Sequence, residues 1–483
     1  MSDMLNNKIL LLIIAINTCI ACTWLDTYSR EDCIPDPKDS YEKLLRDLKS
    51  DNISVQRHAA CLIGQYKNPE AIEPLLAVVG TGRQALDDYA FKSLKTIGYE
   101  KTISHMQASL NGNDQHKRLT AMQANLYIKE YRLLGQLEKI ASHNIYTQRE
   151  RTLAADAILR INKKVGTDIL MSMLTGDDLE LVKGAVKVAE SHRLSSTEGI
   201  MISLTHSENM DVKLSSIASL GEVGGEKSVI RLSELLNENG DILNTAIVAL
   251  GDISNHASVN ALMDLFPNCE NGICLHITNS IYPSSSAAAP VLATRMDDMD
   301  YRVRLGALLT FYSHNRQQFS YDRGYYLKTF ADRMINDKNQ YVRAVAALCL
   351  SSYGYYDLLK YVRAALDKEK IYEYEKDCNK VNHPLEKLAQ KETKGPRYAI
   401  IQLIARIGQP KYMEILIAEA GDKNHEYRSY VTSILEKFSG HKYGQNIEAW
   451  RKWWSENKHK YEQLEDSSTL DVGTKAPAAA PAE

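Results

Sequence analysis

Few side chains of this 483-residue chain have the spacing of a known catalytic, phosphate-binding or metal-binding motif. The stretch GEVGGEKS, residues 221–228, has the glycines of a phosphate-binding loop. However, Glu226 stands where that loop needs a glycine before Lys227, and the stretch follows a predicted helix instead of a strand. No two of the 13 histidines are four residues apart, as a zinc-protease helix requires, and no Gly-x-Ser-x-Gly elbow occurs. We therefore predict no catalytic residue, no metal site and no cofactor, and a protein that is not an enzyme.

The cysteines suggest structural roles. Cys269 and Cys274, in NCENGIC, could close a small disulfide loop in an oxidising compartment, but Cys274 also fits a buried helix position of the repeats described below. Both interpretations stay open from the sequence. Cys61 and Cys349 lie among small core residues, in HAACLIG and AALCLSS, and are expected to pack as small hydrophobic side chains.

The N-terminus carries the one strongly apolar run of the chain, which is unbroken from residue 9 to residue 16. It is too short to cross a bilayer, which takes about 20 apolar residues. A short apolar run that follows a lysine, here Lys8, and precedes small residues has the layout of a secretory signal. We therefore predict a signal peptide over residues 1–21.

The end of that run, CIAC, resembles the lipobox of bacterial lipoproteins, in which a small residue precedes a lipid-modified cysteine. Ala21 and Cys22 match this pattern, whereas Cys19 stands where the family usually has leucine. The resemblance implies lipidation of Cys22, followed by a lipid-anchored tether over residues 22–38. A bacterial lipoprotein carries more than one acyl chain, and two chains suffice for stable membrane anchoring. An ordinary cleaved signal and a buried first helix are the alternatives.

Length and charge limit the remaining possibilities. The net charge of -3, from 58 basic and 61 acidic residues, provides no general attraction for nucleic acid. The chain also exceeds the size of a single core, about 250–300 residues, so it must form several domains or one repeat body.

Internal repeats decide between these two. SLGEVGGEKSVIRLSELL, from Ser219, aligns with ALGDISNHASVNALMDLF, from Ala249, with leucine, glycine, an acidic residue, serine and valine in register. The same frame, an apolar residue followed by small ones, recurs along the chain. Its copies lie at Val55, Tyr89, Val182, Val212, Ile242, Cys274, Val303 and Val342, with weaker ones near Arg118, Arg151, Ala399 and Tyr427.

Each unit is predicted to be a pair of helices. In the first copy, Val55, Ala59 and Leu62 have the three- and four-residue spacing of one helix face. Gly64 and the Asn68-Pro69 pair supply the turn to the second helix. No alternating stretch of useful length predicts a strand. Because such short pairs bury their apolar faces only by stacking, we predict an all-α fold, an α-solenoid superhelix of about twelve helical hairpins over residues 39–438.

At family level, the units DNISVQRHAACLIGQYKNPEAIEPLLAVV, MDYRVRLGALLTFY and NQYVRAVAALCLSSYG resemble HEAT repeats, specifically the short HEAT-like type of phycobilisome lyase subunits. Residues 367–396 break the period with dense charge, as an insertion or a degenerate repeat. The segment YGQNIEAWRKWWSEN is similar to a tryptophan-rich closing segment of bacterial HEAT-repeat proteins, which implies a cap over 439–463. Residues 464–483 are rich in small residues, prolines and acids and are predicted to be disordered.

Tyrosine is unevenly distributed, since eighteen of the 27 tyrosines fall at or after Tyr301. Tyrosine joins an apolar ring to a polar tip and suits partly wet recognition surfaces, which favours the C-terminal half as the binding half. The alternative is that these side chains fill gaps between irregular repeats. The candidate binding residues are Tyr321, Tyr325, Tyr326, Tyr353, Tyr355 and Tyr356.

The leading functional hypothesis is a non-catalytic, lipid-anchored scaffold of a bacterial cell envelope, facing the periplasm or the surface. It would hold a protein or peptide partner, not nucleic acid, in the solenoid groove. Thr23 is not the aspartate that resemblance to enterobacterial lipoproteins associates with inner-membrane retention, which favours the outer membrane. One alternative follows the lyase resemblance and is a chromophore-handling subunit. Another is a glycan-binding protein that uses Tyr321, Tyr325 and Tyr326.

Overall fold

The computed structural model describes residues 33–282, 287–314, 323–352, 358–369, 383–422 and 427–462. The predicted signal peptide, Cys22, the start of the tether and the tail over 464–483 lie outside these residues. Within them every regular element is an α-helix or a short 3-10 helix. The prediction of an all-α solenoid of helical hairpins is confirmed.

The chain divides into two units, of which the first comprises residues 1–200 and 207–215. Its α-helices are α2 (Tyr41–Asp47), α3 (Ile53–Leu62), α4 (Ile72–Leu76), α5 (Gln84–Asn111), α6 (Gln115–Ile128), α7 (Leu134–Ser142), α8 (Gln148–Ile161), α9 (Lys163–Leu174) and α10 (Leu179–Ser191). Its 3-10 helices are η1 (Ile63–Tyr66), η2 (Pro69–Ala71), η3 (Tyr131–Leu133) and η4 (Ser195–Thr197). Two further helices, α11 (Glu198–Leu204) and α12 (Met210–Val223), contain residues of both units.

The second unit comprises residues 201–206 and 216–483. Its α-helices are α13 (Glu226–Leu235), α14 (Gly240–Ile253), α15 (His256–Met263), α16 (Asn271–Ser280), α17 (Ala288–Arg295), α18 (Tyr301–His314), α19 (Arg323–Asn336), α20 (Gln340–Ser352), α21 (Leu359–Glu369), α22 (Pro384–Thr393), α23 (Pro396–Ile407), α24 (Met413–Gly421), α25 (Arg428–Ser439) and α26 (Ile447–Glu462). The 3-10 helices η5 (Phe266–Asn268) and η7 (Pro410–Tyr412) precede α16 and α24.

Local sequence sets where these helices begin. Asn52 caps α3 by accepting hydrogen bonds from the backbone N–H groups of Ser54 and Val55. At the start of α8, Thr147 and Glu150 form a capping box. Such side chains satisfy the N–H groups that the first helical turn leaves without partners.

The long helix α5 consists of the two helices of one hairpin. Gly98 interrupts α5 with φ 142° and ψ 110°, which are not helical values. A positive φ of this kind is readily adopted only by glycine, so Gly98 separates the two helices of a hairpin without a loop.

With this division, the described residues contain twelve first helices and twelve second helices. The first helices are α3, α5 up to Ile97, α6, α8, α10, α12, α14, α16, α18, α20, α23 and α25. The second helices are α4, α5 from Tyr99, α7, α9, α11, α13, α15, α17, α19, α21, α24 and α26.

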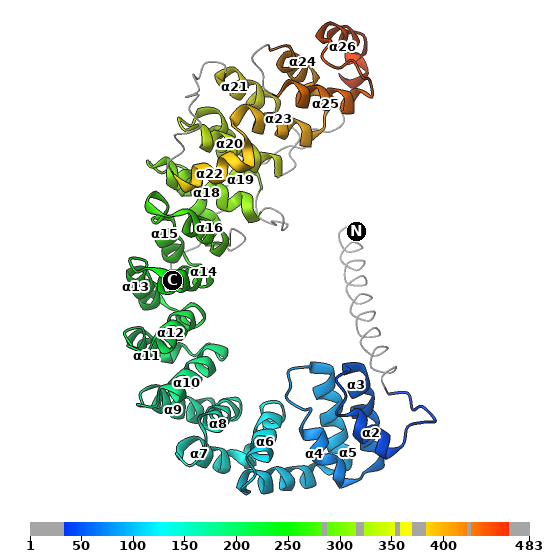
Figure 1. Cartoon of the computed structure of the whole chain (residues 1–483), viewed down its shortest axis with the longest axis vertical. Coiled ribbons are helices and arrows are strands. Elements are labelled where there is room, and N and C mark those ends of the chain that lie inside the picture. Colours follow the sequence, from blue (N-terminus) through cyan, green and yellow to red (C-terminus); the bar gives the residue numbers. More distant parts are fainter. Residues whose placement is uncertain are drawn as a thin grey trace, which may run out of the picture. The chain divides into compact units, whose positions relative to one another are not determined.

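Stacking of these hairpins builds the core of each unit (Figure 1). In the first unit, α3 packs against α5, α5 against α6, α6 against α8 and α8 against α10. In the second unit, the same relation joins α14 to α16, α16 to α18, α18 to α20 and α20 to α23. Apolar side chains such as Leu250 of α14 are completely buried between the layers. Each layer therefore depends on its neighbours, as in HEAT-like repeats generally.

The tryptophan-rich segment forms α26, which packs against α24 at the C-terminal end of the stack. Trp450 is fully buried and Trp453 nearly so. The indole N–H of Trp450 donates to the carbonyl of Gly444 at 2.9 Å, so burial leaves this polar group satisfied.

One cysteine expectation is wrong. Cys61 does not pack as a free small side chain, because it forms a disulfide with Cys33, which lies 28 residues earlier and has its Cα at 5.5 Å. This disulfide could not be predicted from the sequence, because Cys33 lies in an irregular segment that no helical spacing places against α3. Cys349 is buried and unpaired, as expected, and burial raises the pKa of its thiol.

Among the described residues, no helix combines the length and the apolar character needed to cross a membrane.

Candidate functional site

The helix α22 departs from the repeat pattern and defines the candidate site. It lies between α21 and α23 in the chain, yet α20 packs directly against α23, so α22 is not a layer of the stack. Instead it contacts α16, α18 and α20, the first helices of three successive hairpins (Figure 1). We call this contacted surface of α16, α18 and α20 the α22 face.

The apolar side of α22 explains its position. Leu385, Ala389 and Thr393 are buried and recur every four residues, so they form one stripe along the helix. The helix begins with Pro384 after the N-cap His383, whose Nδ1 accepts a hydrogen bond from the N–H of Leu385 at 3.3 Å. Leu388 is half-buried beside this stripe, and the remaining side chains after Pro384 are polar, as expected of a helix that covers a surface.

Tyr301, the first residue of α18, holds the N-terminal end of α22. Its hydroxyl donates to Oε1 of Glu386 at 2.9 Å. Burial raises the pKa of Tyr301 to about 12, and the bond to the Glu386 carboxylate acts in the same direction because it favours the neutral hydroxyl. The interaction is therefore a donor–carboxylate hydrogen bond throughout the neutral range.

Tyr312, near the end of α18, holds the other end of α22. Its hydroxyl donates to Oε2 of Glu392 at 3.4 Å, a longer and more exposed contact than that of Tyr301. Burial raises the pKa of Tyr312, with the charge of Glu392 adding to the effect. Because the starts of α18 and α22 meet, and their ends meet, the two helices run in the same direction.

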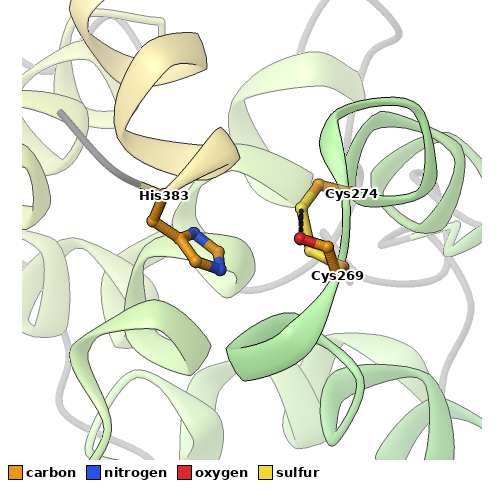
Figure 2. A group of neighbouring side chains, drawn as sticks. All are labelled: Cys269, Cys274 and His383. Carbon is orange, nitrogen blue, oxygen red and sulfur yellow. Dashed lines mark hydrogen bonds between the residues drawn. A yellow bond between two sulfur atoms is a disulfide. The ribbon is translucent and has the colours of Figure 1, made fainter.

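A group of two cysteines and one histidine lies at the start of α22 (Figure 2). Cys269 and Cys274 form a disulfide, with Cα atoms 5.4 Å apart, at the end of η5 and in α16. The imidazole of His383 faces them from α22. One ligand atom from each of the three residues lies within 4.8 Å of the other two.

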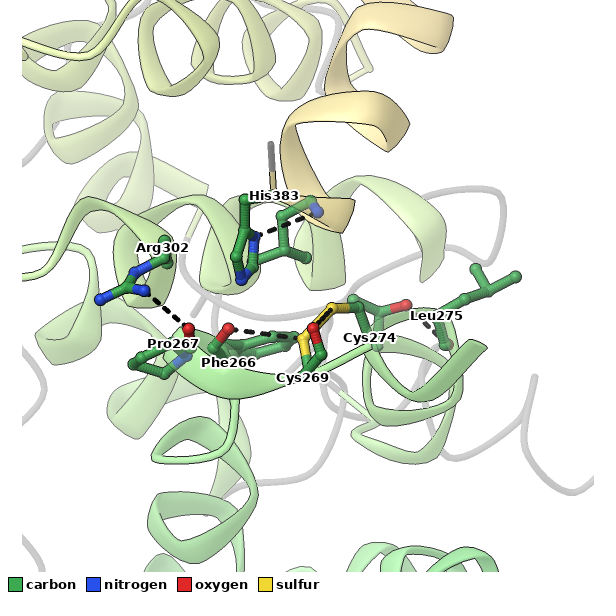
Figure 3. Close-up of a disulfide and its surroundings, with 9 residues drawn as sticks. Phe266, Pro267, Cys269, Cys274, Leu275, Arg302 and His383 are labelled. Atoms are coloured by element: carbon green, nitrogen blue, oxygen red, sulfur yellow. Dashed lines mark hydrogen bonds between the residues drawn. A yellow bond between two sulfur atoms is a disulfide. The ribbon is translucent and has the colours of Figure 1, made fainter. Parts of the chain in front are cut away.

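His383 has an unusual environment (Figure 3). Its Nε2 is buried and has no hydrogen-bond partner in the described part of the chain. Burial lowers the pKa of His383, and the positive charge of Arg302 adds to this effect. The carbonyl groups of Phe266 and Pro267 face the ring and oppose part of the lowering, but neither makes a hydrogen bond of normal geometry to Nε2.

Arg302 holds the segment at Pro267, which lies next to the His383 ring (Figure 3). It donates to the carbonyl of Pro267 at 2.7 Å, and its guanidinium forms a forked pair with Asp300, with contacts between 2.6 and 3.1 Å. An open depression of about 500 Å³ adjoins the group and is lined also by Glu270, Pro384 and Lys387. The cysteine–histidine group is therefore next to solvent.

The residues predicted for binding are not those of the α22 face. Tyr321, Tyr353, Tyr355 and Tyr356 lie outside the described residues, as does the side chain of Tyr325. Tyr326 is half-buried in α19, with its ring 5.4 Å from that of Phe311.

Tyr301 and Tyr312 were missed, although the excess of tyrosine after residue 301 pointed to their region. Their eleven-residue separation on α18 is the signal that could have found them, since it places both side chains on one helix face. Nothing in the sequence links either tyrosine to α22.

No protein-family model and no curated protein matches the chain. Among solved structures it is similar to yeast importin-beta, with 11% identity, a TM-score of 0.36 and coverage of 88% of this chain and 65% of the other. Importin-beta from another crystal is 12% identical with a TM-score of 0.32, covering 82% and 57%. An engineered protein is 15% identical with a TM-score of 0.27, covering 76% and 99%.

The chain thus spans about two thirds or less of the importins it resembles, and at these values the similarity says nothing about function. The class of the protein follows from its own helices: it is an α-solenoid of HEAT-like hairpins, with one inserted helix on its first-helix side.

Proposed function

We propose that this chain is a scaffold that binds a helical segment of a protein partner on the α22 face. The observation that supports the proposal most directly is the position of α22 itself. A surface made of the first helices of three hairpins accepts a short amphipathic helix through one buried stripe and two hydrogen bonds. A partner helix with the same pattern, apolar residues every four positions and carboxylates near both ends, fits the same contacts.

The attachment of α22 is weak enough for such a replacement. Leu385 is the one large apolar side chain of α22 that is fully buried, Leu388 is half-buried beside it, and fully burying a leucine contributes about 1.5–3 kcal/mol. Each tyrosine–carboxylate bond adds about 0.5–1.5 kcal/mol net. A partner helix with larger apolar residues would exceed these contributions and displace α22.

The proposed location is a bacterial cell envelope, with Cys22 carrying the lipid and the outer membrane favoured. The lipobox-like segment supports the anchor. The two disulfides, Cys33–Cys61 and Cys269–Cys274, support an oxidising compartment, because cytosolic proteins are usually kept reduced.

The binding proposal is tested by supplying α22 in trans. In one variant of the full chain, residues 383–393 are replaced by glycine and serine, which removes the helix and keeps the chain length. A labelled peptide of residues 383–395 is stapled between positions 387 and 391, because isolated helices of this length are marginal in water. Lys387 and Lys391 are both exposed, so the staple avoids the buried stripe. We expect the peptide to bind the variant and not the intact chain, measured by fluorescence anisotropy.

Two matched controls make the result specific. A stapled peptide with Leu385→Asp should not bind, and Tyr301→Phe in the variant should weaken binding several-fold. Equal binding to the intact chain, or no binding to a variant with native circular dichroism, would show that the α22 face is not a helix-binding surface.

The anchor is tested separately. Wild-type protein should partition into the detergent phase and incorporate a labelled fatty acid, whereas Cys22→Ser should do neither. Equal partitioning of the two proteins contradicts lipidation at Cys22 and leaves the binding proposal untouched.

A further inference from the structure

We propose that Cys269, Cys274 and His383 form a zinc site when the Cys269–Cys274 disulfide is reduced. The residue types are those that bind zinc, since thiolate sulfur and imidazole nitrogen are its usual protein ligands. This contradicts the expectation of no metal site. His383 is remote from the cysteines in the chain, and only the packing of α22 on α16 brings it to them.

The geometry requires small movements. Zn–S and Zn–N distances of about 2.3 and 2.0–2.1 Å place tetrahedral ligand atoms about 3.5–3.8 Å apart. The three ligand atoms already lie within 4.8 Å of one another. Opening the disulfide separates the two sulfur atoms toward the required spacing, so His383 needs to approach them by at most about 1.3 Å.

His383 is available for this role. Its Nε2 is buried without a hydrogen-bond partner in the described part of the chain, which is a costly state that a metal ion would relieve. Binding through Nε2 places the ring proton on Nδ1, so the long 3.3 Å bond from the N–H of Leu385 is given up. One long cap bond is thus exchanged for a metal ligand.

The chemistry balances with a dithiol reductant. The reductant transfers two electrons and two protons to the disulfide, which opens to two thiols while the reductant closes its own disulfide. Zn²⁺ then displaces one proton from each thiol, and two thiolates with one neutral imidazole bind the ion. Three protein ligands leave one position for water, which the adjoining depression of about 500 Å³ can supply.

The ion would join parts of the chain that otherwise meet only through noncovalent contacts. His383 is the N-cap of α22, and Cys274 lies in the first turn of α16. Zinc would therefore fasten α22 to its face in the reduced form, whereas the disulfide leaves α22 unfastened. The zinc site itself does not depend on the proposed partner binding.

The test uses the full chain purified in detergent with Cys33→Ser and Cys61→Ser, so that one described disulfide remains. After reduction with a phosphine and its anaerobic removal, Zn²⁺ is titrated against a chromophoric chelator, and Co²⁺ is used to detect thiolate charge-transfer absorption. We expect the reduced chain to bind one equivalent and the oxidised chain to bind none. Zinc should also slow amide exchange in α22 of the reduced chain.

The variants identify the ligands. Cys269→Ser and Cys274→Ser should each abolish the charge-transfer band. His383→Asn keeps an oxygen that can cap α22 but removes the imidazole, and should weaken zinc binding about 10-fold or more. Cys349→Ala is the matched control for a described cysteine outside the group, since its buried thiol lies in α20, and should bind as the parent does.

Two results would overturn the proposal. One is a reduced parent with native circular dichroism that binds no Zn²⁺. The other is stoichiometric binding that survives the Cys269→Ser/Cys274→Ser double substitution or is lost in a folded Cys349→Ala variant, since either places the ion elsewhere. Circular dichroism and thermal unfolding without zinc show whether each variant is folded.

Discussion

The hairpins of the stack and the inserted helix α22 are held in different ways. Charged cross-links of the stack join residues about one repeat apart, such as Arg118 to Glu150 and Arg304 to Asp337, at separations of 32 and 33 residues. The bonds from Tyr301 and Tyr312 to α22 span 85 and 80 residues. Each hairpin of the stack is thus held by the hairpins next to it in sequence, whereas α22 is held by a surface that is remote from it in sequence.

The difference in separation costs little. Loop-closure entropy grows with the logarithm of loop length, so going from 33 to 85 residues adds about 0.8 kcal/mol. A single buried leucine offsets that amount. We therefore expect α22 to leave its face without unfolding the hairpins beneath it.

The largest effect is expected inside the stack, at the ion pair of Arg343 and Glu369, whose side chains are only 2% and 1% exposed. Glu369→Ala leaves the arginine charge buried without its carboxylate and should lower the free energy of unfolding of the second unit by about 3–5 kcal/mol. Urea denaturation followed by circular dichroism measures this.

The control for that prediction is the double variant Arg343→Met/Glu369→Leu, which should recover most of the stability because buried apolar pairs replace buried ion pairs well. Glu100→Gln provides a second control, since the Glu100 carboxylate is 79% exposed in its pair with Arg132 and should contribute at most about 1 kcal/mol. An equal loss for Glu369→Ala and Glu100→Gln would contradict the importance of burial here.

Loss of a buried leucine should spread further in the stack than in α22. Leu250→Ala in α14 should destabilise the second unit by about 2–5 kcal/mol and increase amide exchange across neighbouring hairpins. Leu385→Ala in α22 should cost about 1.5–3 kcal/mol and increase exchange in α22 alone, because undocking limits the loss. Hydrogen exchange with mass spectrometry distinguishes them. If Leu385→Ala loosened α18 and α20 equally, α22 would be part of the stack after all.

The stack was predictable from the sequence because its signals are local. The spacing of Val55, Ala59 and Leu62, and the offset between the copies at Ser219 and Ala249, repeat the same packing problem many times. Stacking is the physical solution that such hairpins share, so the twelve first helices followed as well, whereas the twelfth second helix, α26, lies in the segment predicted as a cap.

The candidate site was not predictable because its contacts are unique and remote in the chain. Residues 367–396 were recognised as irregular, but no periodicity states which face an inserted helix covers. The pairing of Tyr301 with Glu386 and the approach of His383 to Cys274 depend on how α22 packs across the layers. Cys33–Cys61 escaped for the same reason, since Cys33 lies outside the repeats.

A smaller effect is expected for Tyr301→Phe, which removes the bond to Glu386 and should weaken α22 docking by about 0.5–1.5 kcal/mol at neutral pH. The pKa of Tyr301 is raised from the ordinary value near 10 to about 12, by burial first and by Glu386 second, with Asp300 assisting and Arg302 opposing. Between pH 10 and about 12, the Tyr301 hydroxyl therefore keeps its proton in the folded state and loses it in the unfolded chain.

The sign of the pH dependence follows from that proton. The contribution of Tyr301 is fully present below pH 10 and is lost as the pH rises through about 12. The difference in unfolding free energy between wild type and Tyr301→Phe should thus shrink over this interval, measured by urea denaturation at fixed pH steps. A difference that stays constant across it would mean that the Tyr301 hydroxyl does not hold α22.

The smallest effect is expected at the other end of α22. Tyr312→Phe removes a 3.4 Å bond to the exposed Glu392, so the loss should be about 0.5 kcal/mol or less. Because the Tyr301 end is held more tightly, α22 should open from Thr393 toward Pro384, and amide exchange should be faster in its last turn than in its first. Zinc bound at His383 would increase that contrast, whereas faster exchange in the first turn would place the weak end of the helix at the cysteine–histidine group.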